Sequence, residues 1–135
     1  MTGPARGPGR GEGDERCAHP GHAALRAGDD ALREAARQLG RDPLSLEHLR
    51  CAVRQVRRLS AGLADLTDAL ADRAHHLAVA EALSDTRPGS PPADRTVREV
   101  VRDLHAVARH LHVGDVLLEP SDDDLAHLRA APGPG

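Results

Sequence analysis

Two cysteines and three histidines are the side chains best suited to hold a metal ion. Cys17, His19 and His22 form a C-x-H-x2-H cluster, and His48 and Cys51 lie three residues apart further along the chain. Thiolate and imidazole are ligands that zinc prefers in proteins. The spacing matches no standard zinc-finger pattern, and the first cluster lies in a segment rich in glycine and proline. We therefore predict no metal site and no cofactor, and leave open whether these five residues bind metal.

Two aspartate–histidine pairs have the spacing of ligand pairs in di-iron helical bundles, Asp72–His75 and Asp124–His127. Such a site also needs glutamates from two further helices, all projecting inward. Here Asp72 and His75 fall on the polar side of a predicted helix, so we assign them to the surface. The chain also lacks the G-x-S-x-G and H-E-x-x-H motifs and the glycine patterns that bind phosphate. No catalytic residue and no enzyme activity are predicted.

The side-chain types that are missing exclude further functions. The chain has 135 residues, no aromatic residue, and 18 basic residues that are all arginine, which is typical of a high-GC bacterium. Without lysine there is no Schiff base, and without aromatic rings there is no platform for stacking bases. The net charge of −3 argues against a general affinity for nucleic acid. No apolar run approaches the roughly 18 residues of a membrane span. A cytoplasmic protein with reduced cysteines and no membrane partner is expected.

Cationic side chains recur every three or four residues over 95–112. This arginine stripe comprises Arg95, Arg98, Arg102, His105, Arg109 and His112. On a helix it could meet phosphates or an acidic partner helix. Glu99 and Asp103 interrupt its edge, and the stripe carries no aromatic or amide side chain to read bases. Solvated surface is the favoured interpretation. The alternative is a small regulatory protein that contacts nucleic acid or another anionic partner through the stripe.

The longest predicted helix, over residues 43–83, carries the clearest apolar pattern. Five large apolar residues recur every seven positions and form a leucine seam: Leu49, Val56, Leu63, Leu70 and Leu77. The seam is flanked by further apolar residues at Leu46, Val53, Leu59 and Leu66. A helix of this length spans ~60 Å, and the period is that of a coiled coil or helical bundle. A charge at Leu63 is expected to disrupt both helicity and assembly.

The same helix has a charged face that is basic first and acidic later. Its members are Arg50, Arg54, Arg57, Arg58, Asp65, Asp68 and Asp72. In an antiparallel pair of such helices the basic half of each would meet the acidic half of the other, which selects orientation. The alternative is a solvated face whose charges pair within the monomer, by contacts along the helix and with the helix that follows.

Start and stop signals predict the remaining elements. A first helix begins at Asp29 or Asp30 and ends at Gly40, and Asp42 followed by proline opens the long helix. After a proline-rich loop over 84–94, Thr96 and Glu99 form a capping box for a helix about half as long, which ends near Gly114 or frays on to Leu118. One apolar stripe is predicted on this helix: Val97, Val101, Leu104, Ala108 and Leu111. A short helix is expected after Pro120, opened by Ser121 with Asp124.

Together these features predict an all-α fold. We expect an elongated helical bundle built on one long helix, about 43–83, with shorter antiparallel helices packed on it. Residues 1–21 are predicted to be a disordered tail, 22–131 a single helical domain, and 132–135 a second tail. The seam and its flanks are wider than one helix can bury. A protein–protein interaction module that forms a homo-oligomer is therefore expected, preferably an antiparallel dimer, or else one that binds another helical protein.

Overall fold

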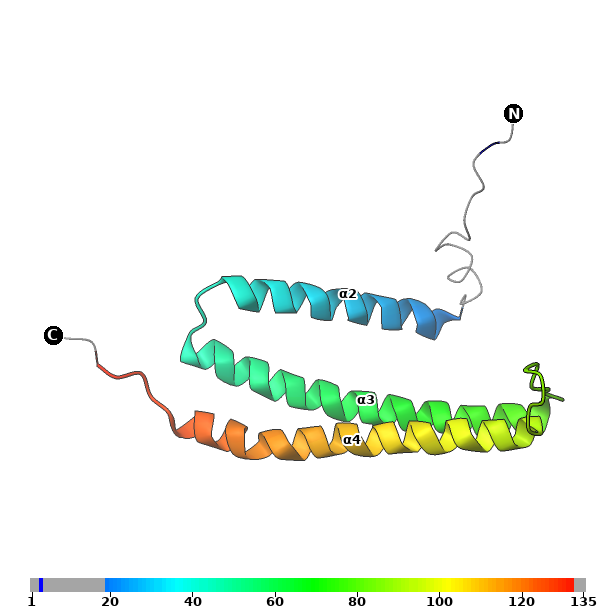
Figure 1. Ribbon diagram of the computed structural model, residues 1–135. Helices are drawn as coiled ribbons and strands as arrows, with labels where there is room; N and C mark the ends of the chain where they lie inside the picture. Colours follow the sequence, from blue (N-terminus) through cyan, green and yellow to red (C-terminus); the bar gives the residue numbers. More distant parts are fainter. Residues whose placement is uncertain (1–2, 4–18, 133–135) are drawn as a thin grey trace. The chain divides into compact units, whose positions relative to one another are not determined.

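The computed structural model describes residue 3 and residues 19–132. They form three helices and no strand, α2 (Pro20–Arg41), α3 (Leu46–Ala80) and α4 (Ala93–His127), which confirms the all-α prediction (Figure 1). The chain divides into two compact units, 1–44 and 45–135, which are described separately. The single domain over 22–131 stays a prediction. Most of the first predicted tail and residues 133–135 of the second lie outside the described residues.

Helix α2 begins well before the predicted start at Asp29 or Asp30. Pro20 occupies its first turn, where the missing N–H of proline costs nothing. His19 is the N-cap, and its Nδ1 accepts a hydrogen bond of 3.0 Å from the backbone N–H of Gly21. Residues 20 and 21 are therefore helical and do not belong to the predicted tail. The helix also passes through Gly28, whose weak helix propensity suggested a later start.

The C-terminus of α2 is set by proline and not by glycine. Gly40 lies inside the helix, and Gly89 is the one glycine of the described segments with a positive φ. Asp42 is extended, with φ −86° and ψ 145°. The residue before a proline is pushed out of the helical region, and Pro43 follows Asp42 directly. The predicted glycine cap at Gly40 is therefore wrong.

Helix α3 is slightly shorter than predicted at both ends. Ser45 is its N-cap, in place of Asp42, and the Oγ of Ser45 accepts a hydrogen bond of 3.1 Å from the N–H of His48. Asp42 cannot open α3 because it already closes α2. Glu81 leaves the helical region with φ −123°, so α3 ends at Ala80.

Helix α4 differs most from the prediction, because it is as long as α3: each helix has 35 residues. It begins at Ala93 and continues through both Gly114 and Pro120. The expected half-length helix and the separate short helix after Pro120 are one element. Thr96 does not cap the helix, since its Oγ1 donates a hydrogen bond of 2.9 Å to Asp85.

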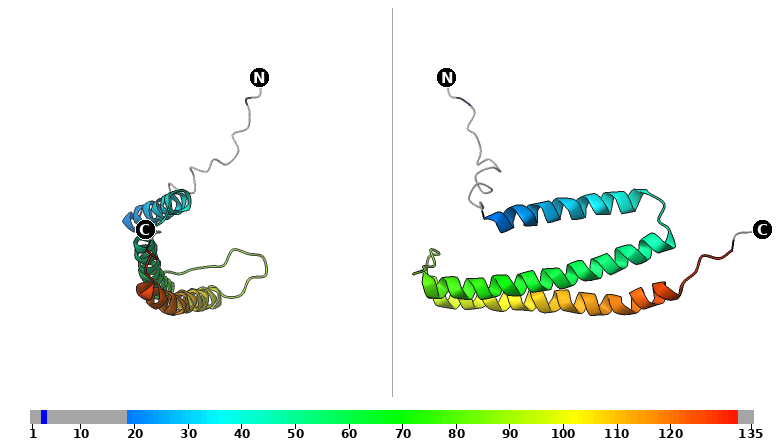
Figure 2. Two further views of the ribbon diagram at one scale, coloured as in Figure 1. Left: turned by 90° about the vertical axis from the view of Figure 1, so that its left-hand side faces the viewer. Right: turned by 180° about the vertical axis from the view of Figure 1, so that it is seen from behind.

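Helices α3 and α4 lie side by side and antiparallel, as both views along the pair show (Figures 1 and 2). The turn between them contains Arg87, Pro88, Gly89 and Ser90, and the N–H of Ser90 donates to the carbonyl of Arg87 at 3.1 Å. Gly89 has φ +68°. Proline second and a left-handed glycine third are the residues that a type II turn requires.

Asp85 ties the loop to the first turns of α4. Its carboxylate accepts hydrogen bonds from the backbone N–H of Arg87 at 3.1 Å, from Arg87 Nε at 2.9 Å and from Thr96 Oγ1 at 2.9 Å. The side chain is only 6% exposed. The bonds from the guanidinium and then the backbone N–H of Arg87 hold the pKa of Asp85 well below its usual range.

This loop contact predicts a stability loss at acid pH. The folded-state pKa of Asp85 lies below the unfolded value, so the carboxylate stabilises the fold fully above the unfolded pKa. The stabilisation disappears as the pH falls below about 4 toward the folded pKa. We expect the Tm to fall in this range, and Asp85→Asn to lower the Tm at neutral pH and reduce the acid-dependent fall. Thermal melts followed by circular dichroism test this. Asp94→Asn is the control, because the Asp94 side chain is 71% exposed; equal acid sensitivity of Asp85→Asn and the wild type would contradict the prediction.

Candidate interaction surfaces

From Ser60 onward, the residues of α3 that face α4 are small. These residues follow a 4-3-4-3-4 spacing and are buried or half-buried: Ser60, Ala64, Thr67, Ala71, Ala74 and Ala78. Ala64 and Ala71 have no exposed surface. Ser60 Oγ donates a hydrogen bond of 2.7 Å to the carbonyl of Leu111 on α4, so the two helices approach closely. This small-residue stripe is the side of α3 that α4 covers.

The facing stripe of α4 supplies the larger side chains. The predicted residues of this stripe are all buried or half-buried: Val97, Val101, Leu104, Ala108 and Leu111. The same 4-3 spacing continues beyond Gly114 to Asp115, Leu118, Asp122 and Leu125, which are also half-buried. A methyl group on Gly114 would lie 3.4 Å from Ser60 Oγ, which is an ordinary van der Waals distance.

The leucine seam of α3 is exposed. Its five residues Leu49, Val56, Leu63, Leu70 and Leu77 have exposed fractions of 37%, 51%, 41%, 46% and 46%. At 100° per residue, Leu63 and Leu70 lie roughly 100–120° around the helix from Ala64. The seam therefore points away from the contact with α4. It was predicted to pack in the bundle, and α4 leaves it open.

Two valines of α4 extend this apolar surface. Val100 and Val107 are 45% and 50% exposed and lie one turn from the residues that face α3. In an antiparallel helix pair, the residues directly before the contact positions of one helix lie on the same side of the pair as the residues directly before the contact positions of the other. Val100 and Val107 therefore lie on the side of the hairpin that carries the seam. Val100 and Val107 were not predicted from the sequence, because a single apolar stripe was assigned to this helix.

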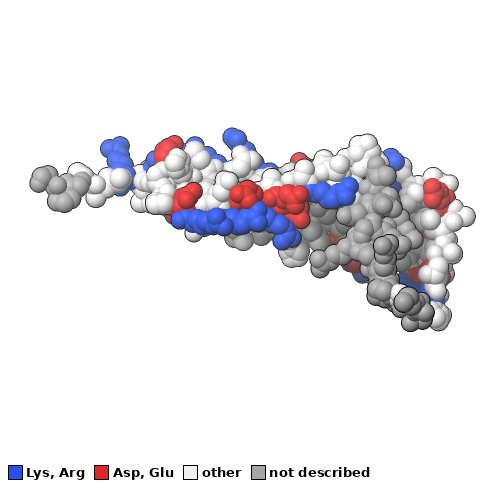
Figure 3. All heavy atoms as spheres, turned by 90° about the horizontal axis from the view of Figure 1, so that it is seen from above, with Lys and Arg blue, Asp and Glu red and all other residues white. Residues whose placement is uncertain are grey.

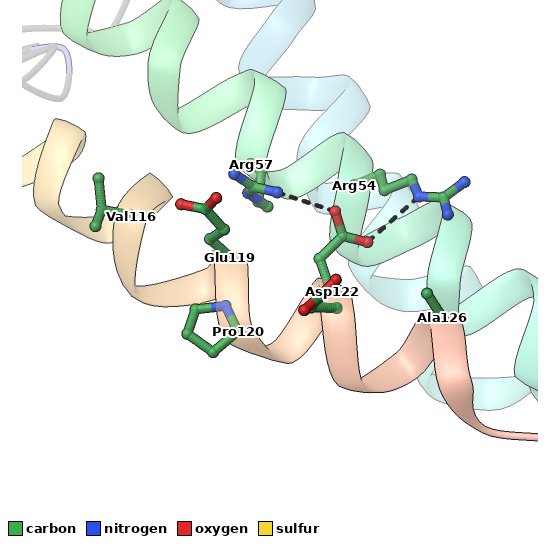
Figure 4. A pocket seen from close by; sticks show the side chains of 8 residues that line it. Arg54, Arg57, Val116, Glu119, Pro120, Asp122 and Ala126 are labelled. Atoms are coloured by element: carbon green, nitrogen blue, oxygen red, sulfur yellow. Dashed lines mark hydrogen bonds and ion pairs between the residues drawn. The ribbon is translucent and has the colours of Figure 1, made fainter.

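An ionic cluster joins the N-terminal half of α3 to the C-terminal half of α4 (Figure 4). Arg57 donates to Asp115 at 3.0 Å and to Asp122 at 2.9 Å, and Arg54 donates to Asp122 at 3.3 Å. The hydrogen bond with Asp122, reinforced by Asp115, raises the pKa of Arg57 above its ordinary value. Arg50 contacts α4 as well. Three residues of the predicted charged face, Arg50, Arg54 and Arg57, therefore bind α4 within the hairpin.

Arg50 caps the C-terminal end of α4. Its guanidinium donates to the carbonyl oxygen of Leu128, the C-cap, and to that of Leu125, which also accepts from the N–H of Leu128. The cation also complements the negative end of the helix dipole. These contacts and the ionic cluster hold the last turns of α4, beyond Pro120, against α3.

The ionic cluster makes the hairpin sensitive to removal of Asp122, whose side chain is 18% exposed. We expect Asp122→Asn to lower the Tm by roughly 4–8 °C, because both Arg54 and Arg57 lose a charged acceptor. Thermal melts at low and high salt test this. Asp123→Asn is the matched control, since Asp123 is the next residue and its side chain is exposed. A Tm that is equally unchanged in both variants would contradict a stabilising role for the cluster.

The other members of the charged face divide into paired and open residues. Asp68 Oδ1 lies 2.8 Å from Nδ1 of His105 on α4 and accepts a hydrogen bond from it. Arg58, Asp65 and Asp72 are exposed. Pairing within the monomer, the alternative considered from the sequence, thus accounts for Arg50, Arg54, Arg57 and Asp68.

The arginine stripe of α4 is exposed but partly neutralised. Three of its members lie near acidic neighbours on the same helix, in the pairs Arg95–Glu99 at 3.7 Å, Arg98–Asp94 at 3.4 Å and Arg102–Asp103 at 3.6 Å. Arg109 is exposed as well. Figure 3, seen from above the view of Figure 1, draws another face and does not single out this stripe; acidic and basic side chains lie beside one another there too. Such mixed charge does not favour phosphate binding, and the anionic partner stays a prediction.

The candidate metal ligands are not brought together within the described part of the chain. Cys17 lies outside it, and His19 uses its Nδ1 to cap α2. His48 and Cys51 are both exposed on α3, and Cys51 is a free thiol. Among residues 19–132, no three histidine, cysteine, aspartate or glutamate side chains form a group that could hold a metal ion.

None of the three helices has both the length and the apolar character that crossing a membrane requires, as far as the described residues extend. Comparisons of the chain with protein-family models, curated proteins and solved structures gave no match.

Proposed function

We propose that the protein is a non-enzymatic helical interaction module that self-associates through the leucine seam of α3. The observation that carries this proposal is the exposure of the seam: its five large apolar residues are 37–51% exposed although α4 packs along α3. Val100 and Val107 widen the apolar surface on the same side of the hairpin. A contiguous apolar surface of this kind is typical of a protein–protein contact.

A second copy in antiparallel orientation is the partner that fits the seam. The apolar positions are evenly spaced, so an antiparallel copy centred on Leu63 sets Leu49 against Leu77 and Val56 against Leu70. The three charges that α4 leaves open, Arg58, Asp65 and Asp72, lie roughly 140–180° around the helix from Leu63 and so outside a contact on the seam.

Size-exclusion chromatography with light scattering tests the proposal, with refractive-index detection because the chain has no aromatic residue. We expect a mass near twice 14.3 kDa. The dimer should persist at high salt, because apolar burial provides most of the affinity and exposed charge pairs contribute little. A monomer at micromolar concentration would contradict self-association and would direct the search to a different protein as the occupant of the seam.

A further inference from the structure

The leucine seam is one half of a wider stripe that runs along α3. Between successive seam residues lies one further position on the same side of the helix, so intervals of three and four residues alternate. This extended seam has ten members, Leu49, Ala52, Val56, Leu59, Leu63, Leu66, Leu70, Arg73, Leu77 and Ala80. All are exposed except Ala52 and Leu66, which are half-buried. The alternation is that of a helix that packs against another helix along its length.

The order of the intervals limits how a second copy aligns with the extended seam. Read forward from Leu49 or backward from Ala80, the intervals are the same, 3-4-3-4-3-4-3-4-3. An antiparallel copy therefore sets every member opposite another member only when Leu49 meets Ala80, because a shift by one heptad leaves members at the ends without an opposite member. The centre of this alignment lies between Leu63 and Leu66, ~2 Å along the helix from Leu63.

The sizes of the facing side chains favour this alignment. Ala52 lies opposite Leu77 of the other copy, and Leu49 lies opposite Ala80, so each outer layer combines a small and a large side chain. Pairs of matched size fill a helix contact without voids. A parallel copy would instead set alanine against alanine at both of these alanine positions.

Arg73 is the one charged member of the extended seam, and it favours the same orientation. In the antiparallel alignment it lies opposite Val56, so its apolar stem covers the valine while the guanidinium reaches solvent. The two copies of Arg73 are then ~26 Å apart along the helix axis. A parallel copy would set Arg73 against Arg73, and like charges that face each other across a contact are unfavourable.

Helix α4 adds an apolar residue at the centre of this alignment. Two contacts fix which parts of the helices lie side by side, Ser60 with the carbonyl of Leu111 and Asp68 with His105. Val107 lies between Leu111 and His105 and is therefore level with the centre of the extended seam. It is 50% exposed on the seam side of the hairpin. A two-fold axis at this level sets the Val107 side chains of two copies level with each other.

From these features we infer the register of the antiparallel dimer: Leu63 of each copy lies opposite Leu66 of the other, and the two-fold axis passes between them beside Val107. The inference rests on the proposed self-association and adds which residues of the two copies meet. It also joins Ala52 of one copy to Leu77 of the other, two residues that a neighbouring register would separate.

An exchange of side chains between positions 52 and 77 tests this register. Ala52→Leu crowds Leu77 of the other copy, and Leu77→Ala leaves a void beside Ala52, so each variant should raise the dimer Kd about tenfold or more. The double variant again combines one large and one small side chain, and its Kd should return to within about threefold of the wild type. Cys51→Leu adds a leucine just outside the extended seam and should leave the Kd unchanged. A double variant in which the two single effects multiply would overturn the register.

Distances between spin labels give an independent measurement on the full-length chain. One label is attached to Cys51 in the Cys17→Ser chain, and another to Asp72→Cys in a chain that carries Cys17→Ser and Cys51→Ser. Both positions are exposed and lie outside the extended seam. In the inferred register the labels of a dimer are separated along the axis by ~40 Å at position 51 and by ~22 Å at position 72.

Other label distances would overturn the register. A shift by one heptad changes the two axial separations by ~10 Å in opposite directions, and a parallel dimer brings both close to zero. In either case the dimer mass, measured beforehand, would still support the proposed function. A monomeric wild-type chain would remove the function and the register together.

Discussion

Replacing Leu63 with Asp is expected to convert the dimer into a monomer that keeps its hairpin. Leu63 lies at the centre of the seam, so a two-fold contact buries two new carboxylates close together in an apolar surface. We expect the Kd to rise at least about a hundredfold. The hairpin should keep its helicity, because Leu63 is 41% exposed and points away from α4. Sedimentation velocity gives the mass and circular dichroism the helicity.

Val79→Asp is the matched control for this variant. Val79 is an apolar residue of the same helix that is 78% exposed, in the column that also carries Arg58, Asp65 and Asp72. It should leave the mass and the helicity at the wild-type values. A dimeric Leu63→Asp variant would show that the seam is not the contact. Loss of helicity in that variant would agree with the expectation, drawn from the sequence, that a charge at Leu63 disrupts helicity together with assembly.

That expectation shows which part of the fold the sequence could predict. The apolar period over 43–83 predicted one long helix, with a helix about half as long returning antiparallel to it; the antiparallel pair is present (Figure 1), but α4 is as long as α3. The helix ends were less accurate, because competing signals lie close together at each of them. Asp42 was predicted to open α3, but because Pro43 follows it directly, Asp42 ends α2 instead.

The seam and its flanks were predicted to be wider than one helix covers, but the side of α3 that packs on α4 was not identified from the sequence. Large apolar residues dominated the interpretation, since burial of leucine contributes more than burial of alanine. The actual contact uses Ala64 and Ala71, whose short side chains let the backbones approach, while α4 provides Leu104 and Leu111. The 4-3 spacing of Ser60, Ala64, Thr67 and Ala71 was a signal that could have revealed this side.

The charged face was ambiguous for a related physical reason. Spacing places Arg54, Arg57 and Asp68 on one side of α3, but it does not say whether the opposite charge comes from the same chain or from a partner. For the arginines that depended on the length of α4, which reaches them because it continues beyond Gly114 to His127. Asp115 and Asp122 lie in this continuation.

The contact through small residues leads to the second large effect. Ala64 has no exposed surface and lies in the middle of the stripe that faces α4, so Ala64→Leu forces the helices apart. We expect a loss of about 1–3 kcal/mol in the free energy of unfolding, although leucine is nearly as good a helix former as alanine. Urea unfolding followed by circular dichroism measures this, in the Leu63→Asp background so that dimerisation does not contribute.

Ala69→Leu in the same background separates packing from helix propensity. Ala69 is exposed five residues further along α3, and the substitution is chemically identical. Its added side chain has room in solvent, so the unfolding free energy should stay within about 0.5 kcal/mol of the background. Equal effects at the two positions would mean that α4 does not pack on the small-residue stripe. A loss confined to Ala64→Leu would establish that stripe as the contact within the hairpin, and so leave the leucine seam available for a second copy.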